Sequence, residues 1–69
     1  MYKLIKTWVT TEETSGWSYG IQIGERRFED LHTDLTRVHQ LMTLLKAYKV
    51  SAEEFAANLE DYVDGLYSL

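Results

Sequence analysis

Histidine and carboxylate side chains, which could bind a metal ion or transfer protons, cluster near the middle of this sequence. Asp30, His32 and Asp34 alternate just before a predicted helix, and His39 lies inside that helix. Helical metal sites carry further ligands three or four residues apart, but no Asp, Glu or His stands at those distances from His39. Alternating polar residues ahead of a helix are typical of turn and capping hydrogen bonds. We therefore predict no metal site and no cofactor.

Three further carboxylates, Glu60, Asp61 and Asp64, lie near the C-terminus. Adjacent residues on a helix point about 100° apart, so Glu60 and Asp61 do not converge, whereas Glu60 and Asp64 share a face. Acid–base catalysis needs a cleft that shifts pKa values, and a chain of 69 residues has little material to form one. Phosphate-binding glycine loops and nucleophile motifs are also absent from the sequence. We predict that the protein is not an enzyme.

The charge of the chain is unevenly divided, although the net charge is only −4. Residues 1–50 carry seven Lys or Arg and six Asp or Glu, whereas residues 51–69 carry five Asp or Glu and no basic residue. Such a run is usually a solvated helix face, and the alternative is a docking surface for a basic partner. On this alternative Glu60, Asp61 and Asp64 are candidate partner-binding residues. The chain contains no cysteine and no apolar run of membrane-spanning length, so we expect a cytoplasmic protein that does not enter a membrane.

Side chains that alternate along the first half of the chain predict an antiparallel sheet. Residues 17–23 alternate between apolar and small or polar side chains, and residues 2–11 are rich in β-branched and aromatic types. Each segment is a predicted strand, and the loop between them would use Gly16 at positive φ. A second tight turn beginning at Gly24 would lead to a possible third strand at 26–30.

Two registers are open for the first strand pair. In the first, Val9 faces Tyr19 and Trp8 faces Gly20, which turns Val9 and Ile5 towards the core and covers a strand glycine with an aromatic ring. A one-residue slip would place Trp8 on the core face and Ile5 and Val9 outside.

Apolar residues at three- and four-residue steps predict two helices in the second half of the chain. The first helix covers residues 34–48 and would be capped by Thr33 or Asp34. The second covers 52–66, where Ser51 and the glutamate three residues later match a capping box. The short link makes the helices antiparallel neighbours. We predict one α+β domain over residues 1–69, with a two- or three-stranded antiparallel meander followed by a helical hairpin on one face.

An exposed sheet surface is the other candidate for function. In the first register Tyr2, Leu4 and Trp8 lie on the face away from the helices, and exposed apolar patches on small domains often bind a partner. Trp17 and Tyr19 are predicted core. We therefore expect a protein-interaction or self-association module, with an unknown protein or a second copy of the chain as its partner.

The alternative function is a small nucleic-acid-associated regulator. Aromatic side chains on a sheet can stack bases, and basic side chains nearby would hold phosphates. The candidates for this weak basic patch are Lys3, Lys6, Arg26 and Arg27. The negative net charge argues against nucleic acid as a partner.

Short motifs in this chain resemble a bacterial family of short proteins that is catalogued as a domain of unknown function. The resemblance is carried by Tyr19-Gly20-Ile21, by Asp30 and Asp34, and by Leu59-Glu60-Asp61-Tyr62-Val63. It implies a β-hairpin followed by two helices. The family supplies no activity, cofactor or catalytic residue that could be transferred to this chain.

Overall fold

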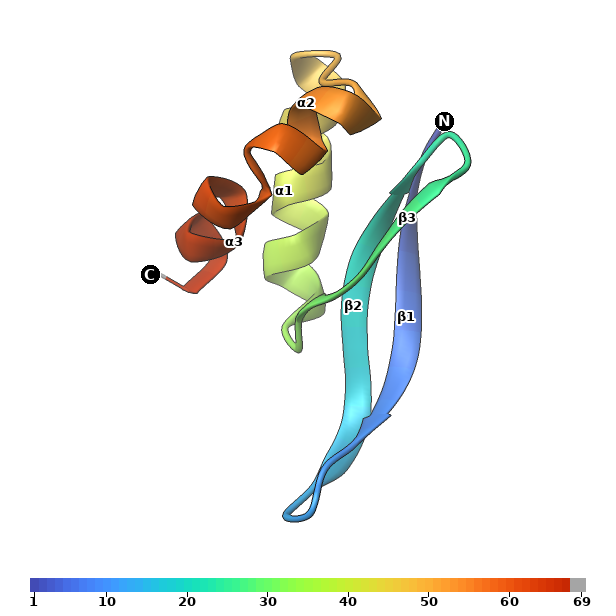
Figure 1. The fold of residues 1–69 in the computed structure, drawn as a ribbon, viewed down its shortest axis with the longest axis vertical. Coiled ribbons are helices and arrows are strands. Elements are labelled where there is room, and N and C mark those ends of the chain that lie inside the picture. The colour runs from blue at the N-terminus through green and yellow to red at the C-terminus, as the bar shows by residue number, and fades with distance from the viewer. Residues whose placement is uncertain (68–69) are drawn as a thin grey trace.

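A computed structural model describes residues 1–67 and shows a three-stranded antiparallel sheet with helices packed on one face (Figure 1). The strands follow one another in space in the order β1-β2-β3: β1 (Tyr2–Thr10), β2 (Ser15–Ile23) and β3 (Arg26–His32). The helices come after the strands: α1 (Leu35–Ala47), α2 (Ala52–Ala57) and α3 (Leu59–Tyr67). The predicted α+β fold is confirmed, and the third strand of the meander forms.

The turn between β1 and β2 is tighter than predicted. The Thr11 N–H donates to the Thr14 carbonyl at 2.7 Å, and the Thr11 hydroxyl donates to the same carbonyl and accepts from the Thr14 N–H. Gly16, which we predicted in the loop at positive φ, is instead a residue of β2. The second turn agrees with the prediction, because Gly24 has a φ of 61°.

This tight turn moves the register of β1 and β2 three residues away from the favoured prediction, which was wrong. Trp8 lies opposite Trp17, and Val9 lies opposite Gly16. An odd shift exchanges the two faces of a strand. Val9 and Ile5 therefore lie on the face away from the helices, as the alternative register had it, although the opposing residues differ from both predictions.

β3 crosses β2 very closely at Gly20. Ile21 lies opposite Phe28 but Tyr19 lies opposite His32, so β3 contains extra residues between these pairs, and Asp30 there has a φ of 56°. A Cβ atom on Gly20 would overlap the Phe28 carbonyl oxygen and lie 3.0 Å from the Glu29 Cα. Position 20 therefore requires glycine for space, because backbone passes directly over it.

The N-terminal caps of α1 and α2 match the sequence signals. The Asp34 carboxylate accepts from the backbone N–H groups of Thr36 and Arg37, at 2.9 and 3.4 Å. Ser51 Oγ accepts from the Glu54 N–H at 3.1 Å. Within the described residues the Glu54 carboxylate makes no return bond to the Ser51 N–H, so half of the predicted capping box forms.

The second predicted helix, over 52–66, is divided into α2 and α3 at Asn58. Its φ and ψ are −116° and 20°, and its Nδ2 donates to the Glu54 carbonyl at 3.0 Å. The Asn58 carbonyl then accepts from the Tyr62 N–H, which starts α3. Asparagine can satisfy backbone groups with its own amide, and this competes with helix continuation.

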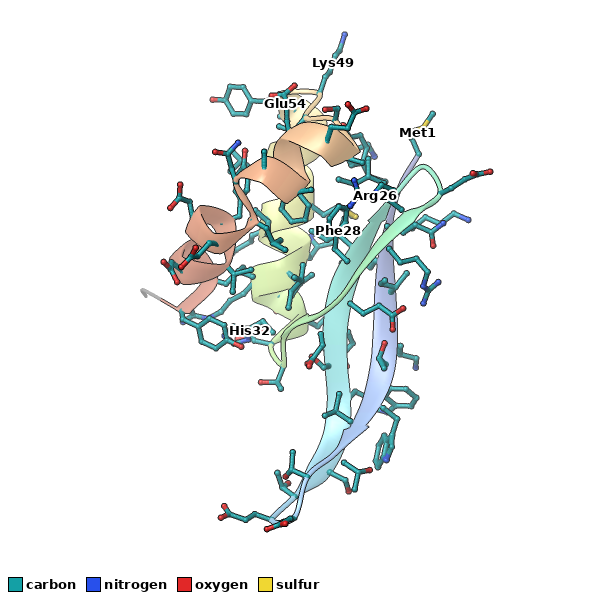
Figure 2. All side chains as sticks on the ribbon, in the orientation of Figure 1. Met1, Arg26, Phe28, His32, Lys49 and Glu54 are labelled. Atoms are coloured by element: carbon teal, nitrogen blue, oxygen red, sulfur yellow. The ribbon has the colours of Figure 1, made fainter. Side chains whose placement is uncertain are left out.

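The core lies between the sheet and the helices. Phe28 lies on this inner side of β3 (Figure 2), and its ring meets that of Phe55 edge to face at 4.7 Å. The buried apolar side chains come from all six elements except β1, with one more from the α1–α2 link: Ile21, Ile23, Phe28, Leu31, Val38, Leu41, Leu45, Val50, Phe55 and Leu66. The far end of the β1–β2 hairpin extends beyond the helices (Figure 1).

Candidate functional site

The hairpin end beyond the helices carries two tryptophans. Trp8 and Trp17 lie opposite each other, and their rings meet edge to face with centroids 5.2 Å apart. They are 55% and 45% exposed, although Trp17 was predicted to be core. Lys6 Nζ lies 4.4 Å from the centre of the Trp17 ring, in a cation–π contact. We call Lys6, Trp8 and Trp17 the tryptophan surface.

The tryptophan surface has a structural role as well as an exposed area. An edge-to-face aromatic pair contributes about 0.5–1.5 kcal/mol beyond its buried area, and directly opposed side chains stabilise the register of a hairpin. The contact also fixes the orientation of both rings. Trp8 and Trp17 therefore present a pre-ordered apolar surface to the solvent.

Tyr2 and Leu4 are not part of the tryptophan surface. We predicted them, with Trp8, on the sheet face away from the helices, but both pack against the buried core. The Tyr2 hydroxyl donates to the Val50 carbonyl at 2.7 Å, which ties β1 to the link between α1 and α2. Of these three residues, Trp8 alone is mostly exposed, so the predicted patch is wrong in composition.

The acidic candidates are exposed on α3. Glu60 and Asp61 occupy its first turn, and Glu53 and Glu54 occupy the first turn of α2. Negative side chains there interact favourably with the positive end of the helix dipole. Asp64 lies one turn further along α3 and is also exposed. Most of the acidic run is thus explained by the starts of two helices.

A shallow apolar groove of about 280 Å³ separates α1 from α3. Its walls are mainly leucine, tyrosine and glycine, with Asp61 and two other polar residues: Arg37, Gln40, Leu41, Leu44, Asp61, Tyr62, Gly65 and Leu66. Arg37 Nη1 donates to the Leu66 carbonyl at 2.8 Å, so this arginine joins the two helices. Asp61 is the acidic candidate that borders the groove.

The histidines have structural partners or point to solvent. His32 Nδ1 accepts from the Asp34 N–H at 2.8 Å, and its ring lies 4.3 Å from that of Tyr67. His32 lies where the sheet meets the helices (Figure 2). His39 is exposed on α1. No group of three or more His, Cys, Asp or Glu side chains among residues 1–67 is placed to hold a metal ion.

The four candidate phosphate-binding cations divide between the two faces of the sheet. Lys3 and Arg27 each lie opposite Gln22 on the face away from the helices. Lys6 and Arg26 belong to the other face, where Arg26 lies over the Phe28 ring at 5.2 Å. No single strip of sheet surface therefore displays all four cations.

Arg27 is paired with Glu29, at 3.0 Å between Nε and Oε2. Hydrogen bonds from Arg27 and from the Thr7 hydroxyl, with the Arg27 charge, lower the pKa of Glu29 below its ordinary value of 4.5. The ion pair is exposed, so the shift reflects surface pairing rather than a catalytic cleft.

Comparison of the chain with models of known protein families, with curated proteins and with solved structures finds no match. The resemblance to a bacterial family therefore stays a prediction. Among the described residues, no helix has the length and apolar character needed to cross a membrane.

Proposed function

We propose that this protein is a binding module that uses the tryptophan surface to contact another protein chain. The observation that carries the proposal is the exposure of Trp8 and Trp17 on a hairpin end that the helices do not cover. Tryptophan dominates the energetics of protein interfaces because it buries a large apolar area with few rotatable bonds. A binding role requires no catalytic group.

The geometry of the tryptophan surface supports this role. The mutual contact of the two rings fixes their orientation before binding, so little side-chain entropy is lost when a partner covers them. Lys6 beside Trp17 adds a positive charge, which disfavours a basic side chain of the partner at this position. We expect an apolar partner surface with no basic residue opposite Lys6.

Affinity capture with matched variants tests the proposal. We would compare the wild-type chain with Trp8→Ala, and with Tyr48→Ala as control, because Tyr48 is 74% exposed on the α1–α2 side of the molecule. A captured protein would be purified and its dissociation constant measured by calorimetry. Loss of a central interface tryptophan typically weakens binding at least tenfold, so we expect that loss for Trp8→Ala and little change for Tyr48→Ala.

Three outcomes would contradict the proposal. Equal binding by wild type and Trp8→Ala would exclude the tryptophan surface. Loss of binding on neutralising Glu60, Asp61 and Asp64, with Trp8→Ala unaffected, would assign the contact to the acidic face of α3. Salt-sensitive retention of single-stranded DNA that requires Trp8 and Lys6 would favour the nucleic-acid alternative.

A further inference from the structure

We propose that the partner of the tryptophan surface is a second copy of this chain, which pairs antiparallel with it along β1 around a two-fold axis at Ile5. This inference rests on the proposed function and names the partner. The proposed pairing joins the three-stranded sheets of the two copies into one six-stranded sheet. The argument uses the unpaired edge of β1, the charges along it, and the position of Glu29.

β1 is an edge strand with free backbone groups. It lies at one side of the sheet, and within residues 1–67 no helix covers its outer edge (Figure 1). The Gly24 N–H donates to the Met1 carbonyl at 2.9 Å, so Met1 and Gly24 form a hydrogen-bonded pair. Hydrogen-bonded and non-hydrogen-bonded pairs alternate along an antiparallel ladder, so the odd-numbered residues of β1 bond to β2. The N–H and C=O groups of the even-numbered residues therefore point outward: Tyr2, Leu4, Lys6, Trp8 and Thr10.

Two-fold pairing of β1 with itself allows few registers. In an antiparallel ladder, residues whose backbone groups point towards the partner strand lie opposite each other. Both members of each bonded pair are therefore even-numbered residues of β1, so the two-fold axis must pass through a residue of β1 and not between two residues. An axis at Lys6 would place the two Lys6 side chains directly opposite, which is destabilising. An axis at Leu4 would pair only residues 2–6 of β1. Axes at Ile5 and at Thr7 each pair seven residues of the strand without opposed lysines.

Glu29 decides between these two axes. The Thr7 hydroxyl donates to Glu29 Oε1 at 2.9 Å, so this carboxylate lies beside β1 on the face away from the helices. An axis at Thr7 would bring two Thr7–Glu29 pairs together and so oppose two carboxylates, each of which has one Arg27 as its counter-charge. An axis at Ile5 places Lys3 of each copy opposite Thr7 of the other. Each Lys3 then lies within reach of the other copy's Glu29, and this charge complementarity favours the axis at Ile5.

The same register covers the exposed aromatic residue of β1. Opposed residues of a ladder point to the same face, so Trp8 of one copy lies beside Tyr2 of the other, next to the core. Leu4 of each copy lies opposite Lys6. The lysines thus avoid each other in this register, although edge lysines generally discourage strand pairing.

The shape of the chain leaves surface for such an interface. Its accessible area is 4954 Å², whereas a compact monomer of 8.1 kDa exposes about 4500 Å². Its radius of gyration is 11.9 Å, against about 11 Å for a compact chain of this length. Both values describe a chain that is less compact than an average monomer of its size.

Disulfide trapping tests the register, because the native chain contains no cysteine. Ile5 meets Ile5 of the second copy in a non-hydrogen-bonded pair, where Cα atoms lie about 4.5 Å apart and a disulfide can form. With oxidised glutathione as oxidant, Ile5→Cys should give a covalent dimer as the main product. Lys3→Cys and Thr7→Cys should each stay monomeric alone and cross-link when mixed. Circular dichroism would check that every variant is folded.

A charge variant tests the same interface without oxidation. Lys3→Glu should raise the dimer dissociation constant at least threefold in sedimentation experiments, because it places a negative charge beside the second copy's Glu29. Lys49→Glu makes the same charge change on the α1–α2 link and should leave the constant unchanged.

The proposal would be overturned by a chain that sediments as a monomer at millimolar concentration, by cross-linking of Thr7→Cys alone, or by a mixed dimer in which Ile5→Cys of one copy is joined to Thr7→Cys of the other. If Trp8-dependent binding of a different protein persisted in any of these cases, the proposed function would stand and the second copy would be excluded as the partner. A dimer that is trapped at Ile5 but indifferent to Trp8→Ala would support the β1 interface and contradict the role of the tryptophan surface.

Discussion

Replacing Gly20 with alanine should prevent stable folding, although the two residues differ by one methyl group. The methyl group would overlap the Phe28 carbonyl oxygen and lie 3.0 Å from both the Phe28 carbonyl carbon and the Glu29 Cα. All three are backbone atoms, so no side-chain rotation can relieve the contact. β3 would have to move away from β2.

The cost of this movement can be estimated from what it disrupts. Overpacking a closely packed site costs about 1–3 kcal/mol, and separating the strands weakens adjacent ladder hydrogen bonds that contribute about 0.5–1.5 kcal/mol each. It would also shift Phe28 from its contact with Phe55. We expect Gly20→Ala to lower the free energy of unfolding by about 3 kcal/mol or more. A core of this size supplies only about 3–5 kcal/mol.

Gly16→Ala is the matched control, because it adds the same methyl group to the same strand. A Cβ atom at Gly16 would have no neighbour within 4 Å among the described residues, and the φ of Gly16 is not positive. Restricting the unfolded chain should then stabilise the protein by about 0.4–1 kcal/mol. Urea denaturation followed by circular dichroism would measure both variants. Equal stability of Gly20→Ala and wild type would refute the close crossing of β2 and β3.

Two further predictions concern single side chains. Ser51→Ala should lower the free energy of unfolding by about 1 kcal/mol in urea denaturation, because the Ser51 hydroxyl caps α2. Glu54→Ala should lower it by only a few tenths of a kcal/mol, because the Glu54 carboxylate makes no return bond to the Ser51 N–H. Equal losses for the two variants would argue for a complete capping box. The lowered pKa of Glu29 means that its ion pair stabilises the folded state above pH 4.5 and loses this effect as the pH falls through the folded-state pKa. Glu29→Gln should therefore be less stable than wild type at neutral pH, with a gap that narrows in acid; a gap that is constant down to pH 2 would contradict this.

Local hydrogen bonds are the part of the structure that the sequence predicted well. The caps at Asp34 and Ser51 and the turn at Gly24 each depend on a few neighbouring residues, and all three form. The register of β1 and β2 depends on which residues form the turn between them. The polar segment between the strands is compatible with more than one turn position, so the sequence did not determine the register. The Thr11 hydroxyl, which closes the turn early, carries no periodic signal.

The exposure of Trp17 was missed because alternation identifies a face of a strand but not how far that face is covered. The lengths of the elements contain this information. Nine strand residues span about 30 Å, whereas the thirteen residues of α1 span about 20 Å. About three residues at one end of the hairpin must then extend past the helix, and in this chain two of the residues concerned are Trp8 and Trp17.

The break at Asn58 changes how the acidic half of the chain should be interpreted. As one helix, residues 52–66 would carry their carboxylates along a continuous surface, which suggests a basic partner. As two helices, they have two N-terminal turns, and four of the five carboxylates occupy those turns. Their position is then explained by helix stability alone. The contact between Trp8 and Trp17 covers only part of each side chain, and the rest stays exposed to solvent. The two tryptophans are therefore stronger evidence for a binding surface than the carboxylates of α2 and α3.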